Sequence, residues 1–509
     1  MQKRINTIII SIIAIIELSL LYYAFFNQYT SIDHAEHLHA SWLVWQQKVP
    51  YLDFFEHHNP LLWYILSPIV ALFNGKPQIL YISRLISLST YIATIFVLYK
   101  ISIKYLKSTR QAFLLGVLVY FSIPASYYLI YDMHPDIFML LAYFIGLYYY
   151  FSYIETKFQK DLNISFLFFT ISFLFLQKIL IILFFTSIYI LYHIFTQKID
   201  IKSFAKALIL PLLIILLFAL WLYYNNILGA YIKLNYTLNY WMQKINGSGN
   251  FCGNKGCSMY LPLLSIFMLK TYLKDKNQYR IILCSIMYLD YISKYFTGSM
   301  YIQYFIFNNL ISSIIIGYFI SKHTKPKSFF LIIAFFVFVS IKLFNQTPIN
   351  KQYKKYYQTA KEIMENLNSD EYFVNAINYI HIYNKDVSYY WFGYGNIAPF
   401  ANYLYNHKKL FTPDFYIQLY RPKYAYYEAY YNAIMGDSKH NGNKTYEKEL
   451  EELYPSFPVS KENKEDFVKR WSQKEFYTYN TEYMNNNYYG TDKFPLIIKR
   501  DYAHSKIRQ

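Results

Sequence analysis

The chain has 509 residues, of which 55% are hydrophobic and 16% are charged. Soluble domains carry about 25% charged residues, so this composition argues against an ordinary cytosolic enzyme. Disorder is excluded as well, because it requires low hydrophobicity and high charge. The net charge is +18, of which residues 1–345 carry +15. No soluble module presents this charge as a basic face, so nucleic acid is not expected as a partner.

Eleven apolar segments are long enough, or nearly so, to form helices that cross a bilayer, which takes about 20 residues. The predicted spans are 5–26, 79–99, 111–130, 137–154, 163–177, 179–196, 207–225, 258–273, 280–298, 301–321 and 328–345. The first span follows the basic sequence MQKR but lacks a small-residue cleavage site. We therefore expect a retained anchor rather than a signal peptide that is removed.

The positions of Lys and Arg predict the orientation of these spans, because short cytoplasmic loops carry an excess of basic residues. With the N-terminus in the cytoplasm, the inner loops hold 18 of the 27 Lys and Arg in residues 1–345. The odd number of spans then places residues 346–509 outside the cytoplasm. The expected fold class is a polytopic α-helical membrane protein with about 11 transmembrane helices and a C-terminal soluble α/β domain. That domain would begin with a polar helix near 351–368.

The outer loop 31–73 contains two further segments with a helical pattern. Residues 32–46 are amphipathic, and Asp33 and Glu36 lie three residues apart on one face. A helix of this kind is expected to lie in the membrane interface. Segment 60–73 is apolar but too short to span, and it contains two prolines, so we expect an interfacial or re-entrant element.

Acidic residues are scarce in residues 1–345, and half of the 12 lie in two outer loops. These six are Asp33, Glu36, Asp53, Glu56, Asp132 and Asp136. The same loops hold six of the chain's 12 His. Polar groups near the membrane are costly and tend to be functional. We therefore expect the two loops to contribute to one site on the outer side.

Three motifs lie in these loops: Asp33-x-x-Glu36, then PYLDFFEHHNPL at 50–61, then His134-Pro135-Asp136. Together they resemble the GT-C superfamily of polyprenyl-phosphate-sugar glycosyltransferases. The most similar branches are the protein O-mannosyltransferases and the aminoarabinose transferases that act on lipid A. The resemblance implies a glycosyltransferase of the cell membrane, with a polyprenyl-phosphate-linked sugar as donor. Its acceptor would be lipid A or lipopolysaccharide, another envelope glycolipid or polymer, or a protein, and its source would be bacterial.

The resemblance also implies roles for particular residues. Asp33 would be the catalytic base that deprotonates the acceptor, and Asp136 would be a second catalytic carboxylate. The residues implied in substrate binding are Glu36, His57, His58, Lys178, Arg84 and Lys294, with the donor phosphate near His58 and Lys178. Structural roles are the alternatives: both aspartates suit helix N-caps, and a lysine at a helix end can extend to the membrane surface.

No cofactor is expected to be required. The cluster of His and acids could bind Zn²⁺, but no HExxH or CxxC motif supports such a site. Cys252 and Cys257 flank a small polar loop, and they either form a disulfide or remain free thiols.

Two other functions stay open at this point. A transporter or flippase for lipid-linked glycans would need charged residues inside the spans and inverted repeats; the sequence has few of the former and none of the latter. A non-catalytic envelope assembly protein would explain the large outer domain but not the motifs.

Overall fold

The computed structural model describes residues 2–27, 32–240, 260–297, 302–323, 335, 338, 341, 351–375, 381–391, 401, 419–420, 424–426, 488–490 and 496–499. The chain divides into two compact units. The helical unit comprises Met1–Thr30, Tyr81–Trp221 and Asn246–Tyr353. The mixed unit comprises Ser31–Leu80, Leu222–Ile245 and Lys354–Gln509. The first outer loop therefore groups with C-terminal residues, although 280 residues separate them in the sequence.

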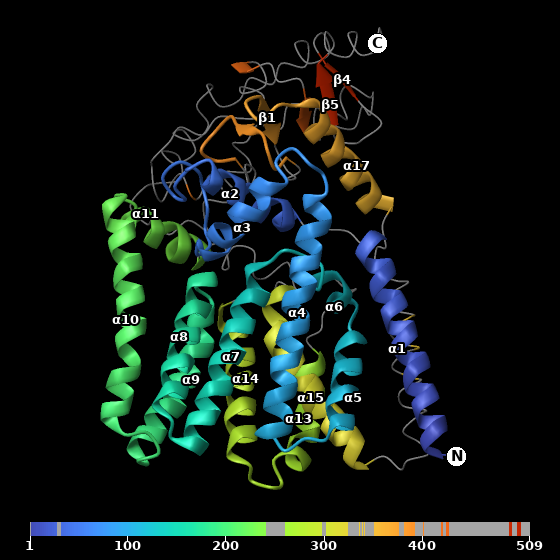
Figure 1. Cartoon of the computed structure of the whole chain (residues 1–509), viewed down its shortest axis with the longest axis vertical. Helices are drawn as coiled ribbons and strands as arrows, with labels where there is room; N and C mark the ends of the chain where they lie inside the picture. Colours follow the sequence, from blue (N-terminus) through green and yellow to red (C-terminus); the bar gives the residue numbers. More distant parts are fainter. Residues whose placement is uncertain are drawn as a thin grey trace, which may run out of the picture. The chain divides into compact units, whose positions relative to one another are not determined.

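The helical unit is a set of helices that run side by side (Figure 1). They are α1 (Gln2–Asn27), α4 (Ile79–Lys104), α5 (Arg110–Phe121), α6 (Pro124–Leu129), α7 (Pro135–Thr156), α8 (Gln159–Phe175), α9 (Ile179–Phe195), α10 (Ile201–Tyr224), α13 (Tyr260–Tyr272), α14 (Gln278–Thr297), the 3-10 helix η2 (Ile302–Phe305) and α15 (Ile306–His323). Each of the first ten predicted spans coincides with one or two of these elements. The eleventh, 328–345, lies almost entirely outside the described residues. Cys252 and Cys257 also lie outside them.

Length and apolar composition together single out four helices of the described residues that could cross a membrane. They are Ile79–Lys104, Pro135–Thr156, Ile201–Tyr224 and Gln303–His323. Others, such as α5 and α9, are apolar but shorter. The structure thus supports a polytopic membrane protein, while the count of 11 stays a prediction.

The predicted span 111–130 is broken rather than continuous. Helix α5 ends at Phe121, and Ile123 has an extended backbone with φ −94° and ψ 124°. Pro124 follows and begins α6. A proline disfavours helical geometry in the residue before it and suits the first turn of a new helix, which accounts for the break.

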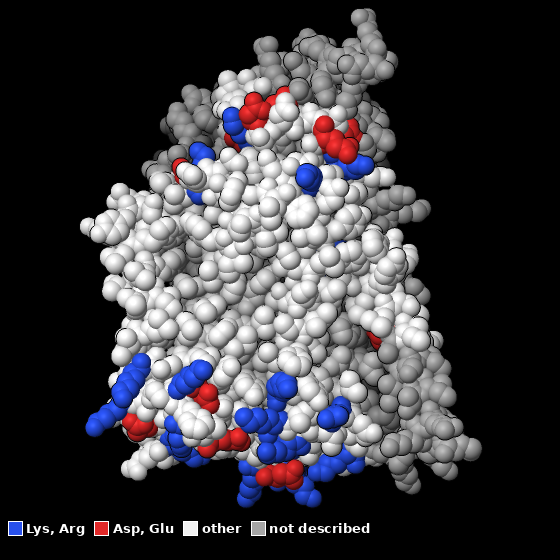
Figure 2. Space-filling model, in the orientation of Figure 1, with Lys and Arg blue, Asp and Glu red and all other residues white. Residues whose placement is uncertain are grey.

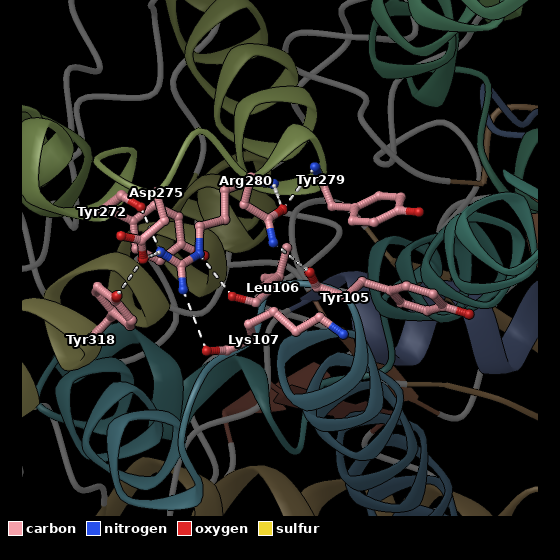
Figure 3. Close-up of polar contacts among 9 residues, drawn as sticks. Tyr105, Leu106, Lys107, Tyr272, Asp275, Tyr279, Arg280 and Tyr318 are labelled. Atoms are coloured by element: carbon pink, nitrogen blue, oxygen red, sulfur yellow. Dashed lines mark hydrogen bonds and ion pairs between the residues drawn. The ribbon is translucent and has the colours of Figure 1, made fainter. Parts of the chain in front are cut away.

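The loops predicted to be cytoplasmic come together at one end of the helical unit. The buried Arg280 donates to the carbonyl oxygens of Leu106 at 2.7 Å and Tyr272 at 2.8 Å (Figure 3). Its guanidinium also faces the rings of Tyr272 and Tyr318, 4.8 and 4.3 Å from their centroids. These contacts join the α4–α5 loop to the α13–α14 loop. On the face drawn in Figure 2, Lys and Arg gather at this end of the helical unit.

Close backbone packing joins two of these helices at glycines. A Cβ atom added to Gly317 in α15 would lie 2.4 Å from the nitrogen of Gly116 in α5 and 2.5 Å from the carbonyl oxygen of Ala112. Small residues of this kind allow membrane helices to approach each other closely. α5 and α15 therefore pack backbone to backbone.

The mixed unit contains the remaining elements. Its helices are α2 (Ile32–Trp45), α3 (Leu61–Leu72), α11 (Leu228–Ile232), the π-helix η1 (Lys233–Leu238) and most of α17 (Lys351–Asn366). Its strands are β1 (Tyr372–Asn375), β2 (Lys385–Asp386), β3 (Tyr424–Tyr426), β4 (Tyr488–Gly490) and β5 (Leu496–Lys499), in the sheet order β2-β1-β3-β5-β4. β1 is parallel to β2 and β3, and β5 is antiparallel to β3 and β4. The helices expected at 32–46, 60–73 and 351–368 match α2, α3 and α17. The solubility and outer location of the C-terminal region stay predictions.

A short segment, 381–391, is hydrogen-bonded to the first outer loop. The indole of Trp391 donates to the carbonyl oxygen of Phe55 at 3.0 Å, and the amide of Phe55 donates to that of Tyr389 at 2.9 Å. The hydroxyl of Tyr383 donates to the carbonyl oxygen of Val70 at the end of α3 at 3.0 Å. These hydrogen bonds hold the segment 381–391 against the first outer loop.

Helix α2 is buried on its polar face as well as its apolar face. Ala35 and Leu38 are buried, as the amphipathic pattern suggests, but His37 and His39 are buried too. Trp391 covers part of the polar face, with its ring centroid 4.6 Å from that of His39. The helix therefore differs from the one-sided interfacial helix that its sequence pattern suggests.

Candidate active site

Three carboxyl groups of the first outer loop lie together in the mixed unit. Asp33 and Glu36 come from the first turns of α2, and Glu56 comes from the loop before α3. Glu36 and Glu56 are buried and share a hydrogen bond, while Asp33 is half-buried. Burial raises the pKa of Glu36 well above its usual range, and the charges of Glu56 and Asp33 raise it further. Burial likewise raises the pKa of Glu56.

The consequence is a division of protonation states among the three acids. Burial of two carboxyls that share a hydrogen bond favours a proton held between them, because a second buried negative charge would be costly. Asp33 has the most contact with solvent of the three. It is the acid of the three that a substrate can reach most easily.

Two histidines complete this cluster. The Nδ1 atom of His58 lies 3.7 Å from the Oε2 atom of Glu56 and 3.9 Å from the Oε1 atom of Glu36. The main-chain amide of His57 donates to the Glu56 carboxylate at 3.3 Å. Burial lowers the pKa of the His57 ring to about 4, so this ring is neutral at pH 7. The ligand atoms of Glu36, Glu56, His57 and His58 all lie within 4.8 Å of one another, an arrangement that could also hold a metal ion.

Residues far away in the sequence support the His57–His58 backbone. The side-chain amide of Asn239 donates to the carbonyl oxygen of His57 at 2.8 Å. The hydroxyl of Tyr231 donates to the side chain of Asn59 at 2.9 Å. Sequence reasoning does not find Tyr231 or Asn239, because more than 170 residues separate them from their partners and neither lies in a motif.

A second charged cluster lies in the helical unit. Asp136, in the first turn of α7, forms an ion pair with Lys178 at the start of α9. The Nζ atom of Lys178 also lies 3.8 Å from the ring centroid of Tyr304. The Lys178 side chain is 26% exposed, against 6% for Asp136, so an anionic ligand could reach the lysine.

Lys294 belongs to a buried network next to this pair. Its Nζ atom donates to Asp290 at 2.5 Å and to the side-chain oxygen of Asn308, whose amide in turn donates to Asp290 at 3.0 Å. Asp136 interacts electrostatically with Lys294, so the two ion pairs are neighbours. The network leaves Lys294 less available to a ligand than Lys178.

The remaining candidates have mainly structural contacts. Arg84 is buried and donates to the carbonyl oxygens of Ala24 and Phe25, near the end of α1. These contacts favour a structural role, and its assignment to substrate binding stays a prediction. Asp132 lies 2.7 Å from the Nε2 atom of His134.

The structure therefore brings together the predicted site residues in two groups. Asp33, Glu36, His57 and His58 lie close together in the mixed unit. The residues Asp136, Lys178, Lys294 and Arg84 belong to the helical unit, the first three of them as neighbours. Whether the two outer loops contribute to one site, as the sequence suggests, stays a prediction.

Comparison with known proteins gives one match. No curated protein and no solved structure matched the chain. The matched family model covers about a third of the chain and includes His57, His58, Asp136 and Lys178, whereas Asp33 and Glu36 precede it. Such a match indicates a membrane glycosyltransferase of the mannosyltransferase type. Residues 57–224 match the family of dolichyl-phosphate-mannose-protein mannosyltransferases, which is a GT-C family and confirms the resemblance seen in the motifs.

Proposed function

We propose that the protein is an inverting glycosyltransferase that moves a sugar from a polyprenyl-phosphate donor to an acceptor of the cell envelope on the outer face of the membrane. Asp33 would be the catalytic base. The family match over residues 57–224 supports the reaction class. The observation that carries the choice of base is the unequal burial of the three clustered acids.

A general base must be ionised and must reach the proton that it accepts. Glu36 and Glu56 meet these conditions poorly, because both are buried and burial raises the pKa of each. Asp33 is half-buried and lies in the first turn of α2, where the helix dipole stabilises a negative charge. The shared proton of the Glu36–Glu56 pair also limits the negative charge beside Asp33. The cluster thus favours fewer than three ionised carboxylates, and Asp33 is the acid of the three that solvent reaches.

The proposed reaction needs a single carboxylate. Asp33 takes the proton from the acceptor's hydroxyl or amine, and the freed electron pair attacks C1 of the sugar. The bond between C1 and the phosphate oxygen breaks, and the phosphate leaves with that electron pair, so the configuration at C1 inverts. Phosphate is a good leaving group without protonation. This distinguishes the reaction from glycoside hydrolysis, which uses a carboxylic acid to protonate the leaving oxygen.

The donor phosphate would bind Lys178. The side chain of Lys178 is 26% exposed, and the residue is the N-cap of α9, where the helix dipole also favours an anion. Its partner in the structure is the carboxylate of Asp136, and a phosphate oxygen would replace that carboxylate as the charge-assisted hydrogen-bond acceptor. Asp136 would then be released near the donor.

The proposal can be tested by mass spectrometry of envelope glycolipids and glycoproteins from cells with and without the protein. We expect one sugar modification to disappear when the protein is absent. An unchanged profile in both classes of molecule would contradict the proposal.

A second comparison uses Lys178→Met and the matched control Lys160→Met, which removes an exposed lysine from the start of α8. Loss of the modification in the first variant and its retention in the second would support phosphate binding by Lys178. Equal modification in both variants would rule out that role.

A further inference from the structure

Three side chains of the types that bind metal ions lie close together in the mixed unit. None of them belongs to the cluster of acids around Asp33. His39 lies on α2, whereas His381 and Asp386 lie in the segment 381–391. The Nε2 atom of His39 is 2.8 Å from Oδ2 of Asp386, and the Nε2 atom of His381 is 2.8 Å from Oδ1 of the same carboxylate. Both histidines are buried, and the Asp386 side chain is only 10% exposed.

The hydrogen bonds of His39 leave a place for a proton or a cation between its ring and Asp386. Its Nδ1 atom lies 2.9 Å from the carbonyl oxygen of Ile382, so Nδ1 must carry a proton and donate it. In a neutral ring, Nε2 then presents a lone pair. That lone pair would face a carboxylate oxygen of Asp386 at 2.8 Å, and two acceptors repel each other at this distance. Either a second proton or a cation must lie between them.

We propose that His39, His381 and Asp386 bind a divalent transition-metal ion, with Zn²⁺ as the best fit to two imidazoles and a carboxylate. Metal-binding histidines usually donate their other ring N–H to a carbonyl or carboxylate, as His39 does to Ile382.

The spacing of the ligand atoms suits such an ion after a small adjustment. Each residue offers one ligand atom, and these atoms all lie within 4.8 Å of one another. A tetrahedral Zn²⁺ about 2.1 Å from each ligand atom would hold these atoms about 3.4 Å apart. The two contacts of 2.8 Å would therefore open by about 0.6 Å, which side-chain rotation can supply. A water molecule would complete the coordination.

Aromatic side chains pack around the proposed ion. The rings of Trp391 and Trp42 lie 4.6 and 5.5 Å from that of His39, and they limit access by water. The ion would fasten α2 to the segment 381–391. This inference does not rest on the proposed function, since a metal can bind here whatever reaction the protein performs.

The first test uses the full-length protein in detergent. After treatment with a chelator, the protein is titrated with Co²⁺, and visible absorption bands report a site with nitrogen and oxygen ligands. Zn²⁺ is then added as a competitor. We expect one equivalent of Co²⁺ to bind and Zn²⁺ to displace it. A wild-type protein that binds neither ion would overturn the proposal.

Variants then locate the site. Loss of a second-shell partner weakens metal affinity roughly 10- to 100-fold, so we expect at least that loss for His381→Gln and for Asp386→Asn. Two controls should bind as the wild type does: Glu56→Gln, in the other candidate cluster, and His323→Gln, at the exposed end of α15. Loss of binding in Glu56→Gln with retention in Asp386→Asn would refute this location.

Thermal unfolding provides a readout that does not depend on spectroscopic changes alone. Zn²⁺ should raise the Tm of the wild-type protein and of His323→Gln, because a ligand that binds only the folded state stabilises it. It should leave the Tm of His381→Gln unchanged. An equal rise in Tm for all of these proteins would contradict the site, even if one variant is less stable to begin with.

Discussion

The shared proton of Glu36 and Glu56 predicts an unusual dependence of stability on pH. Burial raises the pKa of both carboxyls in the folded protein, whereas a glutamate in an unfolded chain titrates near about 4.3. Between the unfolded and folded pKa values, the folded state holds more protons than the unfolded chain. The free energy of unfolding must then fall as the pH rises through this window. One proton difference corresponds to about 1.4 kcal/mol per pH unit.

The variant Glu36→Gln removes this effect while it keeps a hydrogen-bond donor for Glu56. Its side chain resembles the protonated carboxyl but cannot ionise. We expect its free energy of unfolding to fall less steeply with pH, by up to about 1.4 kcal/mol per unit, as the pH rises above the pKa of an unfolded glutamate. Relative to the wild type, the variant should therefore gain stability as the pH rises.

The assay is thermal unfolding of the detergent-solubilised protein at several pH values. The matched control is Glu155→Gln, which neutralises an exposed glutamate at the end of α7 and should leave the slope unchanged. Parallel pH profiles for the wild type and Glu36→Gln would show that the pair holds no extra proton. The reason for choosing Asp33 as the base would then fail.

Three further predictions concern stability, each measured as a change in Tm or in the free energy of unfolding in detergent. Arg280→Met removes charged hydrogen bonds to two main-chain carbonyls. Because each such bond contributes about 1.5–3 kcal/mol, the variant should destabilise the helical unit by several kcal/mol. A loss of less than about 1 kcal/mol would contradict this expectation. Gly317→Ala forces a Cβ atom against the backbone of Gly116 and should lower the free energy of unfolding by about 1–3 kcal/mol. Gly229→Ala is its control, because a Cβ atom there meets no atom within 4 Å. Equal effects of the two variants would refute the close packing. Trp391→Phe deletes one indole hydrogen bond and should cost about 0.5–1.5 kcal/mol, and an unchanged Tm would show that the bond contributes nothing.

Much of the helical unit follows from the sequence, because the length of an apolar run and the placement of Lys and Arg are local signals. Predicted spans such as 79–99 and 137–154 coincide with α4 and α7 to within a few residues. The break at Ile123 does not follow from hydropathy, which stays high through Pro124. The ends of helices depend on single residues, and averaged hydropathy does not register them.

The candidate site could be predicted in part. The spacing of Asp33 and Glu36 on one helix is visible in the sequence, and the structure adds Glu56 as the partner of Glu36. The contact between His39 and Asp386 joins residues 347 positions apart, and no local sequence pattern predicts it. The polar face of α2 therefore suggests exposure to water, whereas the segment 381–391 covers it. Long-range pairings of this kind are a matter of tertiary structure.

The central claim is that Asp33 accepts the proton of the acceptor. It is tested most directly by measuring sugar transfer in membranes that carry Asp33→Asn beside membranes that carry Asp53→Asn. Asp53 is an exposed acid of the same loop that accepts a hydrogen bond from the amide of Val49 at 2.7 Å, and its amide variant removes the same charge. A positioned general base contributes roughly 10²- to 10⁴-fold to rate, so we predict a loss of that size for Asp33→Asn and none for Asp53→Asn. Transfer at the wild-type rate by a folded Asp33→Asn protein would contradict the account.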